Sequence, residues 1–259
     1  MKMEKAFKNK GTRLLFYFLL ISMGIIFPFA SSAETPELTN KPLENEIMNI
    51  LAKNIQCKKI VVQIRLSKEK PHEIKTIAVK LESAILGGIV VDYITVLYEK
   101  PVIDFNQLKK AKKFKIISSA KNKAGILISI KAIERYIAGR VKKLQNKQAR
   151  VSIKFPPPYA ECFFDIPVSE IPPKTLKLLD KYVKGKRLEG YAALQMKAKD
   201  NALSALSLKV IVNHFLIPGA IRQELQKTFN PIYHIPVLSP LRYSINNVTV
   251  QNNYIFLTN

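Results

Sequence analysis

The 259-residue sequence predicts an α+β fold built on antiparallel strands, and three observations support this prediction. Two segments alternate apolar and polar residues, "KKIVVQIRLS" and "EIKTIAVKLE", with the connector Lys68–His72 between them. Two other segments, within residues 43–55 and 129–145, repeat apolar residues at helical spacing. Turn residues at 200–202 and 252–253 separate further pairs of strand-like segments, which is typical of antiparallel hairpins.

The two longest helices are expected over Leu43–Ile55 and Ser129–Gln145. The apolar stripe of the first consists of Leu43, Ile47, Ile50, Leu51 and Ile55. The second helix carries Ile130, Ile133, Ile137, Val141 and Leu144 on one face and Lys131, Arg135 and Lys142 on the other. Two interpretations of this second helix stay open: it packs on the core with a solvated back, or its basic face contacts a membrane surface.

The segments between these helices and the C-terminal half are mostly strand-like. Residues 85–105 are rich in β-branched and aromatic residues, and Gly87–Gly88 predicts a bulge or bend there. Two short strands are expected on either side of Pro156–Pro158. A short helix follows within residues 171–186, with the inward-facing residues Leu176, Leu179 and Val183.

The clearest pair of strands lies between residues 187 and 215. We expect a three-residue loop, Asp200–Ala202, because a two-residue loop would mix apolar and polar residues on each face. This loop pairs Met196 with Leu206, Leu194 with Leu208 and Ala192 with Val210. The C-terminal hairpin turns at Asn252–Asn253 and is expected to pair Val250 with Ile255 and Val248 with Leu257.

A helix is expected between Pro218, which suits a helix start, and Asn230–Pro231, which disfavours its continuation. Its apolar stripe is Ile217, Ile221, Leu225 and Phe229, and its polar face carries Arg222, Gln223, Gln226 and Lys227. The stripe needs an apolar partner, which the inner strand face can supply through Leu206, Leu208, Val210 and Val212. Gly190 and Ala192 make the neighbouring strand thin, which leaves room for a docked helix or for a ligand.

The N-terminus predicts export. Residues 1–33 combine a basic start, an uncharged apolar stretch and the small residues Ser31-Ser32-Ala33, as in a cleaved secretory signal peptide. An uncleaved membrane anchor is the competing interpretation. Residues 34–259 are then expected to form a single domain, periplasmic or extracellular and associated with the cell envelope.

The charge predicts anionic partners. The chain carries +23, of which residues 1–33 contribute +4, so the exported part keeps +19. Because nucleic acid is scarce outside the cytosol, we expect anionic lipid headgroups or acidic wall polymers, with a solubilising lysine-rich surface as the plain alternative. The densest group of cations is Lys109, Lys110, Lys112, Lys113 and Lys115. The two cysteines, Cys57 and Cys162, either pair as one disulfide or remain buried thiols.

The sequence offers little catalytic chemistry. Its three histidines are not spaced as metal ligands, and it contains no nucleophile elbow, phosphate-binding loop or dinucleotide fingerprint. We therefore expect a binding protein rather than an enzyme, without metal or cofactor. A hydrolase that uses Asp92, Asp165 and His214 is the weaker alternative.

Four segments together resemble the LmeA-like phospholipid-binding proteins, an exported bacterial family, and the resemblance covers about residues 45–258. The segments are "GGIVVDYITVLYEKPVIDFNQL", "AGILISIKAIERYI", "ALSLKVIVNHFLIPGAIRQELQKTFNPIYHI" and "PLRYSINNVTVQNNYIFLTN". The sequence departs from the family pattern in the helix at 172–184 and in its high lysine content.

The resemblance implies an elongated α+β fold in which a twisted antiparallel sheet wraps amphipathic helices around an apolar cavity. It also implies phospholipid binding without a reaction, in lipid transfer or envelope lipid homeostasis. Combined with the pattern above, it predicts a cavity lined by Leu194, Met196, Leu206, Leu208, Val210, Val212, Ile217, Ile221, Leu225 and Phe229. The five lysines at 109–115 would hold the headgroup or an anionic surface. The alternative is a basic envelope protein that binds wall polymers by charge alone; the sequence leaves the oligomeric state open.

Overall fold

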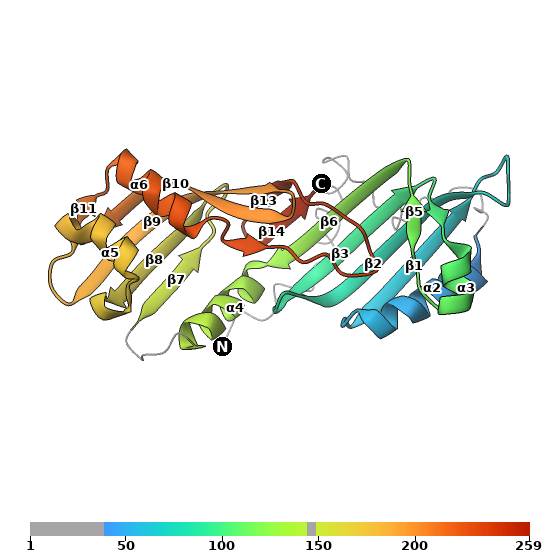
Figure 1. Cartoon of the computed structure of the whole chain (residues 1–259), viewed down its shortest axis with the longest axis horizontal. Helices are drawn as coiled ribbons and strands as arrows, with labels where there is room; N and C mark the ends of the chain where they lie inside the picture. The colour runs from blue at the N-terminus through green and yellow to red at the C-terminus, as the bar shows by residue number, and fades with distance from the viewer. Residues whose placement is uncertain (1–38, 144–148) are drawn as a thin grey trace, which may run out of the picture. The chain divides into compact units, whose positions relative to one another are not determined.

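The computed structural model describes residues 39–143 and 149–259, and the side chains of residues 137–143 also lie outside its description (Figure 1). Leu38–Asn259 form one compact unit. The described helices are α2 (Lys41–Asn54), α3 (Phe105–Ala111), α4 (Ile130–Lys143), α5 (Pro173–Leu179) and α6 (Gly219–Phe229), with short 3-10 turns at Val168–Glu170 and Asp180–Tyr182. Within the described ranges, no helix has the length and apolar character needed to cross a membrane. The signal peptide predicted over residues 1–33 lies outside the described residues.

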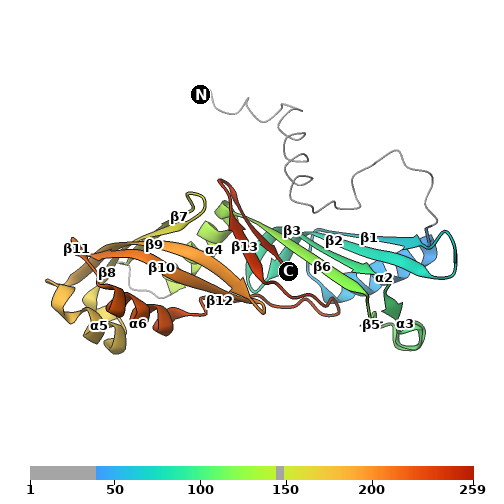
Figure 2. The same ribbon diagram turned by 90° about the horizontal axis from the view of Figure 1, so that it is seen from above.

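The first sheet has the strand order β1-β2-β3-β6-β14-β13 and is antiparallel throughout. Its strands are β1 (Lys59–Leu66), β2 (Ile74–Leu86), β3 (Ile89–Glu99), β6 (Lys121–Ser129), β13 (Asn247–Val250) and β14 (Tyr254–Thr258). Helix α2 packs against this sheet and buries Ile47 and Leu51 completely (Figure 2). The predicted helix at residues 43–55, the strands on either side of Lys68–His72 and the register of the C-terminal hairpin are confirmed.

The second sheet has the order β11-β10-β9-β8-β7, with a short strand β12 also paired to β10. Its strands are β7 (Arg150–Lys154), β8 (Ala160–Pro167), β9 (Arg187–Lys199), β10 (Ala202–Val212), β11 (Phe215–Leu216) and β12 (Tyr233–His234). Helices α5 and α6 lie on the same side of this sheet in Figure 2 and form a hydrophobic cluster with it. A separate pair, β4 (Val102–Ile103) and β5 (Ile116–Ser118), flanks α3. The predicted α+β class with antiparallel sheets is therefore confirmed.

Gly87 and Gly88 form a turn rather than the expected bulge or bend. Strand β2 ends at Leu86 and β3 begins at Ile89, which pairs with it directly. Both glycines have positive φ, 57° and 89°, as a two-residue hairpin turn requires. The β-branched run at 85–105 is thus divided among the end of β2, the whole of β3 and β4.

The register expected for β9 and β10 is wrong near the turn. The loop has two residues, because Asp200 and Asn201 both adopt left-handed φ, 49° and 62°, and Met196 therefore pairs with Ala205 instead of Leu206. An irregularity between Ser207 and Lys209 then adds one residue to β10, which restores the expected pairing further along the strand. The pair expected at that end, Ala192 with Val210, is found. Leu208 is the extra residue of this bulge.

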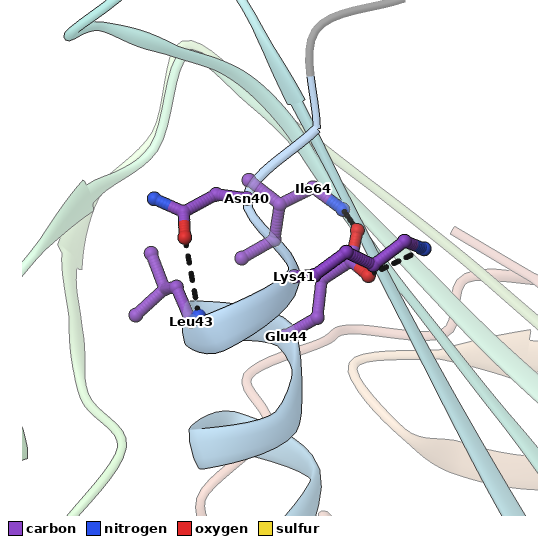
Figure 3. Close-up of polar contacts among 5 residues, drawn as sticks. All are labelled: Asn40, Lys41, Leu43, Glu44 and Ile64. Carbon is purple, nitrogen blue, oxygen red and sulfur yellow. Dashed lines mark hydrogen bonds and ion pairs between the residues drawn. The ribbon is translucent and has the colours of Figure 1, made fainter.

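The start of α2 closes the free edge of the first sheet (Figure 3). The side chain of Asn40 accepts a hydrogen bond from Leu43 N at 3.2 Å, as a helix N-cap does. The buried carboxylate of Glu44 accepts bonds from Ile64 N and Lys41 Nζ, both at 2.9 Å. Because β1 is an edge strand, Glu44 satisfies a backbone N–H that no neighbouring strand reaches.

Candidate functional site

The predicted cavity residues are divided between a closed core and the surface. Val210, Val212, Ile217 and Leu225 are buried in the cluster between the second sheet, α5 and α6, and Ile221 packs at its margin. This part of the prediction, the packing of the α6 stripe on β10, is confirmed. In the structure these side chains contact one another and α5, so they form a packed core.

Most of the remaining predicted cavity residues lie elsewhere. Met196 of β9 packs against the larger core of the first sheet, and Leu194 packs against both this core and the α5–α6 cluster. Leu206 pairs with Gln195 and therefore points to the opposite face, a consequence of the two-residue turn. Phe229, the last residue of α6, is 53% exposed, so the apolar stripe stops one turn earlier.

The space over the thin strand β9 is occupied. Gly190 pairs with Phe164 of β8, and the Phe164 ring lies where a side chain at position 190 would project. The carbonyl oxygen of Ile211 approaches the same place from β10. The room expected over Gly190 for an acyl chain is therefore filled by an aromatic ring in this structure.

The polar side of α6 binds the open edge of β10. Asn230 exchanges two hydrogen bonds of 2.9 Å with the backbone N–H and C=O of Ala205. Gln226 Oε1 accepts from Ser207 N at 3.2 Å, and Arg222 Nη1 donates to the carbonyl oxygen of Leu208. Arg222, Gln226 and the C-cap residue Asn230 are spaced by four residues. Together they bond backbone N–H and C=O groups in a stretch of β10 that β11 does not reach. Sequence reasoning missed this role, because helical spacing shows that they share a face but not what that face meets.

A hollow of about 460 Å³ opens where this edge contact ends. It lies between the β10 bulge and the start of α6 and is lined by Leu208, Lys209, Leu216, Ile217, Pro218, Gly219 and Arg222. Leu208 and Ile217 were predicted as cavity residues and are brought together here. Lys209, Leu216 and Arg222 were missed, because only the bulge and the β11 turn bring them to one place.

Arg222 is the most unusual polar residue of this hollow. Its Nε is buried and has no hydrogen-bond partner among the described residues. Its Nη2 lies 3.8 Å from the position that a Cβ on Gly219 would take, so the guanidinium folds back toward the N-terminus of α6. Pro218 provides no side-chain cap to the first N–H groups of that helix. Cationic and N–H donors thus gather beside apolar Leu208, Leu216 and Ile217.

The five lysines predicted to bind a headgroup belong to a different part of the fold. They lie on α3 and the loop to β5, where Leu108 and Phe114 anchor the segment in the core of the first sheet. All five are exposed, and Lys112 pairs with Glu46 of α2 at 3.1 Å. No described contact joins them to the hollow, so the two halves of the predicted site are not brought together.

Cys57 and Cys162 are both free thiols, so the alternative without a disulfide is the one observed. Cys57 packs against the core of the first sheet and Cys162 against the α5–α6 cluster. Burial raises the pKa of both thiols, which disfavours the reactive thiolate.

Two of the three residues considered for hydrolysis, Asp92 and Asp165, make contacts within the sheets. Asp92 accepts a hydrogen bond from Ser129 N at 2.6 Å on the first sheet. Asp165 binds Arg187 Nε at 2.6 Å on the second sheet, and this hydrogen bond holds the pKa of the carboxyl below its usual value. His214 is an exposed turn residue with φ 71°. Within the described ranges, no three His, Cys, Asp or Glu side chains gather as a metal site would require.

Comparisons with protein families, with curated proteins and with solved structures give no match for this chain.

Proposed function

We propose that this chain is an exported, non-catalytic protein that binds phospholipid and takes part in lipid transfer or envelope lipid homeostasis. The observation that carries the proposal is the hollow beside the β10 bulge, which combines apolar walls with Lys209 and the incompletely bonded guanidinium of Arg222. A phospholipid is the ligand class with both matching parts, an acyl chain and an anionic phosphate.

The size and energetics of the hollow support this proposal. Its volume of about 460 Å³ falls in the range of roughly 300–1,000 Å³ that is usual for small-molecule sites. Each acyl CH₂ removed from water contributes about 0.8 kcal/mol to the free energy of binding. Partial burial of one acyl chain therefore contributes more than any single polar contact there. We propose that the hollow is the mouth of the apolar cavity implied by the family resemblance.

Native mass spectrometry of the gently purified full chain, followed by lipid extraction, tests the function. We expect an added mass that resolves to phospholipid. Titration with a short-chain phosphatidylglycerol kept below its micelle concentration then gives an affinity. A chain without lipid that also fails to bind the short-chain probe would overturn the proposal.

Two substitutions with matched controls locate the site. Leu208→Asp and Arg222→Gln should each weaken binding of the short-chain lipid about tenfold, through loss of an apolar wall and of a charge-assisted hydrogen bond. The controls are Val90→Asp on β3 and Arg135→Gln on α4, which replace exposed residues of the same types away from the hollow. Equal weakening in the controls would remove the hollow as the site.

The exposed lysines of α3 support a second candidate, a protein that binds anionic wall polymers by charge. Simultaneous Lys109→Ala, Lys110→Ala and Lys113→Ala should abolish polymer binding, and wild-type binding should fall steeply between low and high salt. Lys112 is left in place because Glu46 already pairs with it. Unchanged lipid uptake in the triple variant would separate this candidate from the leading one.

A further inference from the structure

The turn between β10 and β11 presents apolar side chains to solvent. Asn213 and His214 both have positive φ, 45° and 71°, so the chain reverses within two residues. The two residues that follow, Phe215 and Leu216, are 40% and 62% exposed, and Leu208 of the bulge is 39% exposed. We call Leu208, Phe215 and Leu216 the hairpin tip.

The hairpin tip is held in a fixed conformation. Asn213 Oδ1 accepts from Glu189 N at 2.9 Å, and Asn213 Nδ2 donates to the carbonyl oxygen of Tyr182 at 3.1 Å. The rings of Tyr182 and Phe215 lie 6.3 Å apart in a tilted contact. The fold therefore holds Phe215 in an exposed position, which reduces the ordering cost when another surface covers it.

Two lysines lie beside this apolar tip. Lys184 Nζ lies 4.6 Å from the centre of the Phe215 ring, and Lys209 lines the hollow next to Leu208. The neighbouring segment, residues 172–186, holds five lysines and one acidic residue, Asp180. Exposed aromatic and aliphatic side chains flanked by lysine match the boundary between acyl chains and headgroups in an anionic bilayer.

We propose that the hairpin tip docks this protein on an anionic phospholipid bilayer. Phe215 and Leu216 enter the headgroup layer, and Lys184 and Lys209 bind lipid phosphates. The charge decides the occupant, because a second copy of this strongly basic chain would bring lysine against lysine.

The inference rests on the proposed function in one respect, namely that the partner belongs to the same lipid class. The docking proposal further identifies the part of the protein that contacts the membrane. Leu208 and Leu216 belong both to the hairpin tip and to the lining of the hollow. Docking by the tip therefore places the mouth of the hollow at the bilayer surface, where a lipid can enter it without crossing water.

A second patch, on β4, α3 and β5, has a related composition and provides the matched control. Phe105 at the start of α3 is 47% exposed and lies in the lysine-rich segment. Phe105 does not border the hollow beside the β10 bulge, whereas Phe215 directly precedes Leu216, which lines it. Phe105 and Phe215 therefore allow the same substitutions to be made in both patches.

The chain contains no tryptophan, so single substitutions create clean fluorescent reporters. With vesicles of phosphatidylglycerol, Phe215→Trp emission should shift to the blue and be quenched by brominated acyl chains, and vesicles of phosphatidylcholine should produce neither effect. Phe105→Trp is measured in parallel. An unchanged Phe215→Trp spectrum in the presence of bound vesicles overturns the inference, and a shift confined to Phe105→Trp assigns docking to the α3 patch instead.

Loss of docking is measured by co-sedimentation with the same vesicles. Phe215→Ser should lower the partition constant at least about tenfold and Lys184→Ala about fivefold, whereas Phe105→Ser should leave it unchanged. Because neither Phe215 nor Lys184 lines the hollow, both variants should still bind the short-chain lipid. Wild-type partitioning in Phe215→Ser refutes docking by the tip even where short-chain binding persists. Absence of short-chain binding in the wild type refutes the proposed function and leaves the docking result readable.

Discussion

The side-chain amide of Asn230 binds the backbone of Ala205 as a neighbouring strand would, donating through Nδ2 and accepting through Oδ1, both at 2.9 Å. Asn230 caps the end of α6, and Ala205 lies on the stretch of β10 that neither β11 nor β12 covers. This contact, repeated by Gln226 and Arg222, converts an exposed sheet edge into a helix-binding surface. The hollow lies where the contact stops.

Replacement of Asn230 by alanine should therefore loosen α6 from β10. It leaves the part-buried N–H and C=O of Ala205 unpaired, and we expect a loss of about 1–3 kcal/mol in the free energy of unfolding, measured by urea titration. Gln223→Ala, on the exposed side of α6, is the control and should change stability by less than about 0.5 kcal/mol. A loss in the control as large as in Asn230→Ala would contradict a specific role of Asn230 in pairing the edge of β10.

Deletion of Leu208 should remove the bulge and retain the fold. Ser207 already pairs with Leu194 and Lys209 with Ala193, so the strand can close over the deletion without a change of partners. We expect the free energy of unfolding to fall by about 1 kcal/mol, because the hydrogen bond from Arg222 to the carbonyl oxygen of Leu208 is lost. Binding of the short-chain lipid should also be lost. Circular dichroism and thermal melting check the fold. Normal lipid binding by a folded deletion variant would separate the bulge from the site.

Glu44→Ala should destabilise the first sheet by about 1–3 kcal/mol, because the buried Ile64 N–H loses its acceptor. Glu44→Gln keeps an acceptor oxygen and should cost less. Glu46→Ala, on the same helix as Glu44, removes a partly exposed carboxylate that pairs with Lys112 and should cost at most about 1 kcal/mol. Chemical unfolding of the three variants gives the order of their stabilities. Equal losses of stability in Glu44→Ala and Glu46→Ala would contradict the role of Glu44 as the acceptor for Ile64 N–H.

Two buried tyrosines should make the fold sensitive to alkali. Burial raises the pKa of Tyr98 and of Tyr243 from 10.0 to about 12. Since the neutral phenol is favoured in the folded state, each contributes stability that is fully present below pH 10 and falls by about 2–3 kcal/mol as the pH approaches 12. Urea unfolding between pH 8 and pH 12, with tyrosinate absorbance, measures both effects.

Tyr98→Phe isolates one of these groups. It should cost about 1–2 kcal/mol at pH 8, because the phenol donates to Arg242 O at 3.2 Å and accepts from Arg242 N at 2.9 Å. The loss of stability between pH 10 and pH 12 should become shallower. Tyr159→Phe, at an exposed position, should change neither quantity. An unchanged alkaline slope in Tyr98→Phe would contradict the assignment.

Local patterns in the sequence determined the identity of the elements. The alternation of apolar and polar residues predicted β1 and β2, and the helical spacing of apolar residues predicted α2 and the apolar stripe of α6. A turn between two alternating segments predicted the C-terminal pairs Val250–Ile255 and Val248–Leu257. These features depend on residues that are close together in the sequence, and the local periodicity of apolar residues reflects them directly.

The tertiary structure decided where those elements meet. The left-handed conformation of Asn201 set a two-residue turn, and the bulge at Leu208 compensated for it, which sequence alternation alone could not reveal. Likewise, the lysines of α3 are separated from the hollow, and Arg222, Gln226 and Asn230 turn toward β10 instead of water. The physical reason is that unpaired backbone groups of an edge strand must be satisfied by whatever side chains the fold brings to them, and those side chains come from about 14 to 25 residues away along the chain.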